Sequence, residues 1–309
     1  MNTVTDKAGL PAKILKIALG LVFVVSAVLK IFDMDQFEIY IYSYHFFSLN
    51  FSYLVARAAI IAELVLGIGL VANGLHKLMW WGSVLMLLGY TLLLLYATVL
   101  GRTDNCHCFG DYLRFNPWQS ILKNVVLLGL FALIYKVKER HYKAPWLLLA
   151  VLVLACSVAV FAANPPDNFT AASRPSKELQ EEALQEALQR PPLDGLKLDQ
   201  GKKVIGIFSS SCDLCKMAAH KLSLMQSYYG FPEEDVLYLF MGSEEGVERF
   251  YADSESTRYQ YVIYDDVKTL FTITQGNFPI VVMMENGGVI HEYGLRNMNE
   301  SEIKSFFQP

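Results

Sequence analysis

Residues 78–100 read LMWWGSVLMLLGYTLLLLYATVL and are followed directly by the polar stretch GRTDNCHCFGDYLRF at 101–115. The first stretch is long and apolar enough to cross a bilayer as a helix, which needs about 20 residues. Four further apolar runs of similar length occupy residues 14–32, 53–71, 121–137 and 146–163. The sequence therefore predicts five transmembrane helices, and the cysteine-bearing stretch connects the third helix to the fourth.

The overall composition agrees with a membrane protein. Hydrophobic residues make up 53% of the 309 residues, which is more than ordinary soluble proteins contain. The formal net charge is only −4, and no stripe of basic residues suits a polyanion. We therefore expect the lipid bilayer as a partner and no nucleic acid.

The distribution of basic residues predicts the orientation in the membrane, because lysine and arginine accumulate on the cytoplasmic side. Basic residues lie before the first run, between the second and third, and between the fourth and fifth, at Lys7, Lys13, Lys16, His76, Lys77 and 136–143. The residues at 33–50 and 101–115 then form extracytoplasmic loops. With five spans, we expect a cytoplasmic N-terminus and a C-terminal domain on the periplasmic side of a bacterial inner membrane.

The region after the last apolar run predicts a linker followed by a second domain. Residues 164–197 contain an Ala/Leu/Glu-rich stretch that is typical of a short helix, opened near Ser176 and stopped by Pro191 and Pro192. Beyond it, short strands at 202–211 and 235–242 flank a helix at 214–230, and a hairpin follows at 278–294 with its turn at Asn286-Gly287-Gly288. This order predicts a small α/β domain at residues 198–309.

The second cysteine pair, Cys212 and Cys215, lies where the first of these strands ends and the helix begins. Free backbone N–H groups and the helix dipole favour a thiolate there, so Cys212 is expected to be the more reactive sulfur. A zinc site would need two more ligands, and His220 and His291 are isolated candidates. We therefore favour redox chemistry over metal binding at this pair.

These residues resemble the active site of the thioredoxin fold. The resemblance rests on the strand VIGIFSSS at 204–211, on Cys212-Asp-Leu-Cys215 and on Phe278-Pro279 before the hairpin. It implies that Pro279 is a cis proline that faces the active disulfide and shapes the substrate-docking surface. The chain departs from the family pattern in having Ser211 where a tryptophan is common, and in a long stretch between the cysteines and the proline.

Cys106 and Cys108 in the polar loop admit three interpretations. They can be incidental loop cysteines, a copper or zinc cluster formed by Cys106-His107-Cys108 with a ligand such as His45, or a redox pair. A disulfide between cysteines two positions apart would be strained, and strained disulfides are usually stronger oxidants. We favour the redox interpretation, and no metal, because a second dithiol is predicted on the same side of the membrane.

The membrane part resembles the MauE/DoxX-like four-helix membrane proteins over residues 1–145, with 146–163 as a fifth helix that tethers the second domain. The matching stretches are 26–44, 57–74 and 106–130, of which the Cys-x-Cys-Phe-Gly run followed by Trp118 and Asn124 is the most specific. The resemblance implies disulfide handling during maturation of exported proteins. The architecture is also similar to the disulfide enzymes of the vitamin K epoxide reductase type.

The distribution of cysteines bears on the electron acceptor. Cys156 is the only cysteine within a predicted span, and one thiol cannot cycle as an intramolecular disulfide. A quinone dissolved in the bilayer is therefore the expected acceptor. Positive charges predicted at the outer ends of spans could steady it or could snorkel to lipid phosphates: Lys30, Arg57, Arg102, Arg114 and Lys123.

An ionisable residue in the middle of a span, such as Glu63, usually faces a polar cavity and matches an acidic position of the family. Arg57 lies six positions away on another helix face, so an ion pair within this helix is not expected. The candidate cofactor or proton site thus comprises Arg57, Glu63, Arg102 and His107.

Together these patterns predict a multidomain protein, an all-α transmembrane bundle followed by an α/β thioredoxin-like domain. The predicted function is that of a membrane thiol-disulfide oxidoreductase in which exported cysteine-containing proteins exchange with Cys212 and Cys215. The latter pair exchanges in turn with Cys106 and Cys108, and oxidative electron flow ends on a quinone. A metal-binding or metalloprotein maturation factor and a transporter or scaffold are the alternatives.

Overall fold

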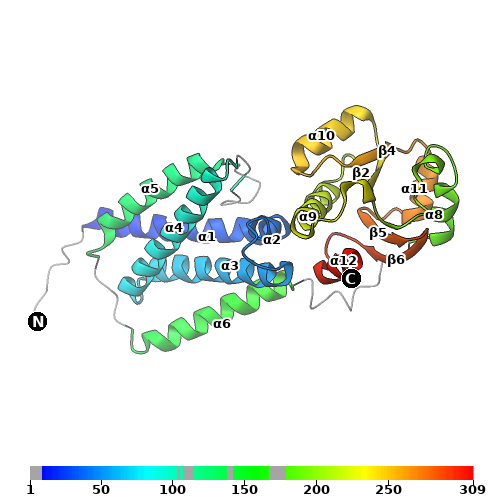
Figure 1. The fold of residues 1–309 in the computed structure, drawn as a ribbon. Coiled ribbons are helices and arrows are strands. Elements are labelled where there is room, and N and C mark those ends of the chain that lie inside the picture. Colours follow the sequence, from blue (N-terminus) through cyan, green and yellow to red (C-terminus); the bar gives the residue numbers. More distant parts are fainter. Residues whose placement is uncertain (1–8, 103–104, 107–114, 138–141, 167–178, 309) are drawn as a thin grey trace, which may run out of the picture. The chain divides into compact units, whose positions relative to one another are not determined.

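The computed structural model describes residues 9–102, 105–106, 115–137, 142–166 and 179–308 (Figure 1). The chain divides into a helical unit, residues 1–166, and a unit built on a mixed sheet, residues 167–309. Among the described residues, five helices are long and apolar enough to cross a membrane: α1 (Leu10–Phe32), α3 (Leu49–Ala72), α4 (His76–Val99), α5 (Pro117–Ile134) and α6 (Pro145–Ala163). The five predicted spans are confirmed, and the protein is an integral membrane protein.

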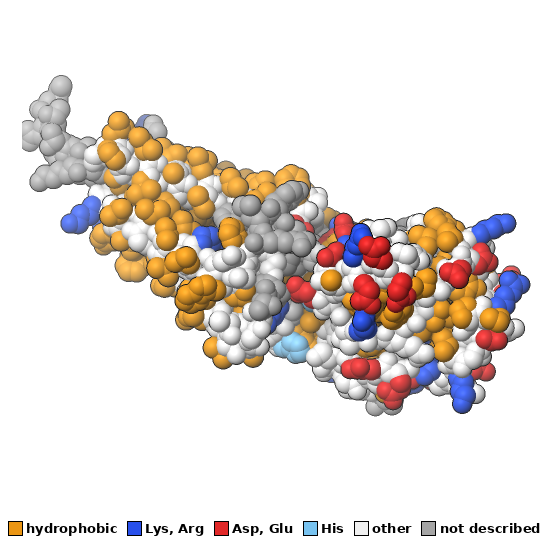
Figure 2. All heavy atoms as spheres, turned by 90° about the horizontal axis from the view of Figure 1, so that it is seen from above, with side chains coloured by type: hydrophobic (Ala, Val, Ile, Leu, Met, Phe, Trp, Pro, Cys, Tyr) orange, Lys and Arg blue, Asp and Glu red, His pale blue; other side chains and the backbone are white. Residues whose placement is uncertain are grey.

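The surface of the helical unit suits a lipid environment. In the view of Figure 2, apolar side chains cover much of this unit, whereas acidic and basic side chains are scattered over the other unit. Helix α6 illustrates the point, because Cys156 and Val160 are its only buried side chains. Most of its other apolar side chains are exposed, which is favourable in lipid and unfavourable in water.

The spans begin earlier than the apolar runs predict, and polar caps stabilise the added first turns of α3 and α5. The Ser48 hydroxyl accepts a hydrogen bond from the Phe51 amide at the start of α3. At the start of α5, Asn116 and Gln119 form a reciprocal capping box, and Pro117 occupies the first turn. Such caps satisfy N–H groups that have no partner within the helix.

A short helix, α2 (Met34–Tyr42), lies where the sequence analysis predicted only a loop at 33–50. Its apolar side chains at Met34, Phe37 and Tyr40 recur every three residues and are buried. At nine residues it is too short to span a bilayer, so a search for apolar runs does not find it. Helix α2 packs on α3 and supplies one wall of the cavity described below.

Helices α1 and α3 approach each other closely at a pair of glycines. A Cβ atom added to Gly20 would lie 2.7 Å from the carbonyl oxygen of Gly67, and the converse distance is the same. Small residues at a crossing let two backbones come together within a membrane. This close packing brings Lys30 of α1 beside Glu63 of α3, at 2.6 Å.

The second unit contains a five-stranded sheet in the order β4-β3-β2-β5-β6. Strands β2 (Lys202–Ser209), β3 (Val236–Met241) and β4 (Gln260–Ile263) are parallel, and β5 (Ile280–Glu285) and β6 (Gly288–Tyr293) run antiparallel as a hairpin. Asn286 and Gly287 form the turn with φ of 48° and 83°, a region that suits these two residue types. The predicted strands and hairpin are thereby confirmed, and β4 is an addition.

Helices cover both faces of this sheet (Figure 1). Helix α9 (Asp213–Tyr229) lies on one face with α10 (Glu244–Ser254) and α12 (Glu300–Phe307), and α8 (Glu181–Leu188) and α11 (Val267–Thr274) lie on the other. The structure is thus an all-α membrane domain followed by an α/β thioredoxin-like domain, as predicted. Helix α10, β4 and α11 occupy the long stretch between the cysteines and Pro279.

Helix α8 lies within the region that the sequence analysis assigned to a linker, residues 164–197. In the structure its side chains Leu184, Ala187 and Leu188 join the core formed by the sheet and α11. The helix ends at Leu188, before Pro191, and Ser176 lies outside the described residues. The described part of this region therefore packs as an element of the second unit.

Candidate active site

The cysteines of the second unit occupy the junction of β2 and α9. Cys212 is the N-cap of α9, and its sulfur accepts a hydrogen bond from the Cys215 amide at 3.4 Å. Cys212 is half-buried, whereas Cys215 is fully buried one turn into the helix. The two sulfurs form no disulfide in this structure. The sequence thus located both residues correctly, with the more accessible sulfur first in the chain.

This placement changes the acidity of Cys212. Hydrogen bonds from Cys215 and from nearby backbone N–H groups lower the pKa of its thiol from 9.0 to about 6, against the opposing effects of burial and of Asp213. A thiolate is stabilised by such donors at a helix N-terminus. Cys212 is therefore ionised near neutral pH, which makes it a nucleophile and a good leaving group.

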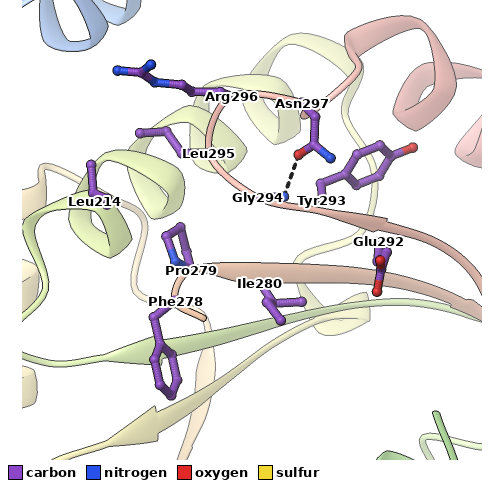
Figure 3. Close-up of a pocket in the computed structure, with 10 residues that line it drawn as sticks. All are labelled: Leu214, Phe278, Pro279, Ile280, Glu292, Tyr293, Gly294, Leu295, Arg296 and Asn297. Carbon is purple, nitrogen blue, oxygen red and sulfur yellow. Dashed lines mark hydrogen bonds between the residues drawn. The ribbon is translucent and has the colours of Figure 1, made fainter. Parts of the chain in front are cut away.

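Pro279 lies at the start of β5, and the Phe278–Pro279 peptide bond is cis, as the resemblance to the thioredoxin fold implies. It borders a cavity of about 210 Å³ that is lined also by Leu214 and Leu295 (Figure 3). Figure 3 shows Leu214 and Leu295 on one side of this cavity and Pro279 on the other. An apolar cavity therefore begins two residues from Cys212.

The loop that closes this cavity is held by specific hydrogen bonds. The Gly294 amide donates to Asn297 Oδ1 at 2.5 Å, which Figure 3 marks with a dashed line. The ammonium group of Lys221, a buried residue of α9, donates to the Leu295 carbonyl at 2.9 Å. These contacts fix the position of Leu295 opposite Pro279.

In the helical unit, Cys106 is buried with 3% of its surface exposed. Its sulfur lies 2.8 Å from the hydroxyl of Ser120, in the first turn of α5, and its amide donates to the Phe115 carbonyl at 3.0 Å. These contacts attach Cys106 to the N-terminal end of α5. Cys108 and His107 lie outside the described residues, so the structure does not test their placement.

A cavity of about 140 Å³ lies directly against Cys106. Its walls come from α1, α2, α3, α4 and the segment between α2 and α3, and they include six aromatic side chains: Phe37, Tyr40, Tyr44, Phe46, Phe47 and Tyr90. Phe46 and Phe47 are exposed, at 56% and 37%. The cavity therefore joins a buried thiol to the outer surface of the helical unit.

Lys30 lines the same cavity and is the only charged residue among its described lining residues. Its ammonium group donates to Glu63 Oε1 at 2.6 Å and to the Ser26 hydroxyl at 2.9 Å. The sequence predicts that Glu63 faces a polar cavity, and in the structure its carboxylate binds the ammonium group of Lys30. Lys30 is only 2% exposed, so it does not snorkel to the lipid surface.

Arg57 is likewise buried and paired, but it lies elsewhere. Its guanidinium forms an ion pair with Glu38 of α2, and it also donates to the Tyr53 and Asn164 carbonyls. These bonds tie α2, α3 and the end of α6 together, and Arg57 does not line the cavity at Cys106. The expected absence of an ion pair between Arg57 and Glu63 agrees with these partners.

Arg102 follows the C-terminal end of α4 and lies over the rings of Tyr40 and Tyr44, which line the cavity. Its guanidinium stacks 4.6 Å from the centre of the Tyr44 ring and donates to the Ser43 hydroxyl at 2.8 Å. Burial, together with the charge of Arg102, lowers the pKa of His45. Arg102 therefore supports the segment that carries Tyr44 rather than lining the cavity itself.

The described residues contain no group of three or more His, Cys, Asp or Glu side chains that could hold a metal ion. Two members of the Cys106-His107-Cys108 cluster lie outside this part of the chain, so the metal interpretation is not tested. Cys156 of α6 is buried in an apolar cluster with Ile60 and Val160, which is the environment of a packing residue.

Comparisons with known proteins agree with this arrangement. Residues 9–137 match the model of a family described as methylamine utilisation protein MauE. A protein named Protein TlpB, from Flavobacterium psychrophilum, is 25% identical over 331 aligned positions that cover 90% of this chain and 90% of that protein. No solved structure matches the chain. The chain thus combines a MauE-like membrane domain with a thioredoxin-like domain.

Proposed function

We propose that this protein is a membrane thiol-disulfide oxidoreductase that oxidises cysteine-containing proteins on the extracytoplasmic side of the membrane. The observation that carries the proposal is the environment of Cys212, whose thiol has a pKa of about 6 at the N-terminus of α9. The neighbouring Cys215 is buried, and the apolar cavity at Pro279 lies beside them. This combination suits a thiol that attacks, and is attacked by, cysteines of another protein.

The first half of the reaction transfers electrons from the substrate. A substrate thiolate attacks Cys212 in the Cys212–Cys215 disulfide and expels the Cys215 thiolate. A second substrate thiol then displaces Cys212, so that the substrate leaves with a disulfide and the site holds two thiols. Because its thiolate is stabilised, Cys212 is a good leaving group, and the stabilised reduced form makes the pair a stronger oxidant. These properties support the oxidative direction.

The second half returns the site to its oxidised form. The Cys212 thiolate attacks a Cys106–Cys108 disulfide, and Cys215 resolves the resulting mixed disulfide. The loop pair is now a dithiol, and its reoxidation releases two electrons and two protons. We propose that a quinone takes up both and leaves as a hydroquinone, so that atoms and electrons balance.

The cavity at Cys106 supports a quinone as the acceptor. Its volume of about 140 Å³ is close to that of an engineered apolar cavity of about 150 Å³ that binds benzene. The aromatic walls suit a planar ring, and the exposed Phe46 and Phe47 leave a way out for a lipid-soluble tail. A ring in this cavity would lie against the wall that Cys106 forms.

The similarities to known proteins also support the proposal. The match to the MauE model covers helices α1 to α5 of the helical unit, for which the family resemblance implies disulfide handling during maturation of exported proteins. The similarity to Protein TlpB covers 90% of this chain and so extends over both units, which supports a function that the two units share.

Quinone reduction by the purified protein tests this function. A short-chain quinone and a reduced dithiol peptide are added, and quinone loss and peptide oxidation are followed together by absorbance and mass spectrometry. We expect Cys106→Ser and Cys108→Ser to abolish quinone reduction. Cys212→Ser should abolish peptide oxidation but leave quinone reduction driven by dithiothreitol. Quinone reduction that persists without Cys106 and Cys108 would contradict the proposal.

A further inference from the structure

We propose that Lys30 binds a carbonyl oxygen of the quinone in the cavity beside Cys106, and that Glu63 positions Lys30 for this contact. The inference rests on the proposed function, because it names the residue that recognises the acceptor at the same site. It goes further in assigning a specific donor, on α1, to a cavity whose other described walls carry no charge.

The hydrogen bonds of Lys30 leave one donor for a ligand. An ammonium group has three N–H donors, and two of them bind Glu63 Oε1 and the Ser26 hydroxyl. The nitrogen lies 5.4 Å from the centre of the Phe37 ring and 5.5 Å from that of Tyr90. Both rings and Lys30 itself line the cavity, so the ammonium group lies at the edge of the space where the ligand would bind.

Glu63 explains how a lysine can be held at this depth. Lys30 and Glu63 are each 2% exposed, and an isolated charge would be unfavourable there. The pair is neutral as a whole, and the Ser26 hydroxyl donates to the second carboxylate oxygen at 3.1 Å. Glu63 therefore fixes the position of Lys30 without lining the cavity at Cys106 itself.

A contact between Lys30 and a quinone oxygen would favour reduction of the quinone. Negative charge develops on the carbonyl oxygens of a quinone as it takes up electrons. A positively charged donor in a site shielded from water stabilises that charge more strongly than it would in bulk solvent. An apolar lipid in the same cavity would gain nothing from Lys30. The combination of one ammonium group and aromatic walls therefore selects a ring that carries a carbonyl group.

The structure provides a matched control for this role. Arg57 and Glu38 form a second buried ion pair in the same unit, but neither residue lines the cavity. The variants Lys30→Met/Glu63→Gln and Arg57→Met/Glu38→Gln make the same chemical change at the two pairs. Neither double variant leaves an unpaired buried charge, whereas changing only one partner would leave one and destabilise the protein.

The test measures the Kd of a short-chain quinone, by quenching of intrinsic fluorescence, and the KM and kcat of quinone reduction driven by dithiothreitol. For Lys30→Met/Glu63→Gln we expect the Kd and KM to rise by about tenfold or more, because a hydrogen bond to a charged group is lost. Lys30→Arg should restore part of the affinity. Arg57→Met/Glu38→Gln should keep the wild-type Kd and KM.

A measurement on the wild-type protein gives a second test that needs no folded variant. We expect 1,4-naphthoquinone to bind at least about tenfold more tightly than naphthalene, which has the same rings without carbonyl groups. Equal affinities, or a Kd unchanged in a folded Lys30→Met/Glu63→Gln protein, would overturn the assignment of Lys30. Tight carbonyl-dependent binding without any quinone turnover would instead preserve the site and contradict the proposed function.

Discussion

The reactivity of Cys212 comes from its position rather than from its chemical type. Cys215 is also a cysteine and lies one turn further along α9. It is fully buried and is therefore protected from other proteins. Cys212 receives hydrogen bonds that stabilise its thiolate, with a pKa of about 6. In the proposed function Cys212 therefore meets the substrate, and Cys215 resolves the mixed disulfide.

We predict that alkylation of reduced Cys212 by iodoacetamide reaches half of its maximal rate near pH 6. The depressed pKa also means that the thiolate stabilises the reduced folded protein. That contribution is fully present above pH 9.0, declines as the pH falls, and is lost below about pH 6. Peptide mass spectrometry after timed alkylation measures the profile, and Cys215 should react more slowly throughout.

Asp213→Asn serves as the internal control for this profile. The Asp213 carboxylate raises the pKa of Cys212, so its removal should shift the half-maximal rate to lower pH. A profile centred near pH 9 in the wild-type protein, or a shift to higher pH in Asp213→Asn, would contradict the account of the thiolate.

Helix α2 and its partner α3 depend on an ion pair that is buried among apolar side chains. Arg57 and Glu38 are each 2% exposed, and both belong to helices that frame the cavity at Cys106. Buried pairs of this kind are sensitive to removal of one partner, because the remaining charge has no compensation.

We expect Glu38→Leu to destabilise the helical unit by about 3–5 kcal/mol, since Arg57 is then buried without a carboxylate. Thermal unfolding in detergent, followed by the fluorescence of the tryptophans in this unit, measures the loss. Arg57→Met/Glu38→Leu should recover most of the stability. The account fails here if the single variant is as stable as the double variant.

Helix α8 belongs to the second unit through the side chain of Leu184, which is fully buried against the sheet. We predict that Leu184→Ala destabilises this unit by about 2–5 kcal/mol, the usual range for a buried leucine. Hydrogen exchange of β2 and β5 should accelerate accordingly. Glu182→Ala, at an exposed position of the same helix, should leave the exchange unchanged. Equal exchange in both variants would place α8 outside the cooperative unit.

Local patterns in the sequence predicted those features that are determined locally. The apolar runs predicted five spans, and the position of Cys212 at a strand end predicted its place at the start of a helix. The pairs Lys30–Glu63 and Arg57–Glu38 were not predicted, because their partners lie 33 and 19 positions apart and meet only through the packing of helices. Helix α2 was missed because its three-residue apolar period is carried by a segment too short to span a membrane.

The whole chain joins two units that each hold a cysteine pair, with Cys156 as a separate packing residue. The second unit has the surface and the thiolate for exchange with proteins. The helical unit has a buried cysteine beside a cavity that suits a lipid-soluble ring. Under the proposed function, neither unit alone could carry electrons from a protein thiol to an acceptor in the bilayer, which would give a physical reason for their fusion in one chain.

The central claim is that Cys212 exchanges directly with the loop pair. The most direct measurement uses Cys156→Ala/Cys215→Ser variants that retain Cys212 with either Cys106 or Cys108, oxidised in detergent and digested for non-reducing mass spectrometry. We predict an intramolecular disulfide between Cys212 and one loop cysteine that disappears on reduction. Absence of this disulfide in both variants, with both units folded, would contradict the claim.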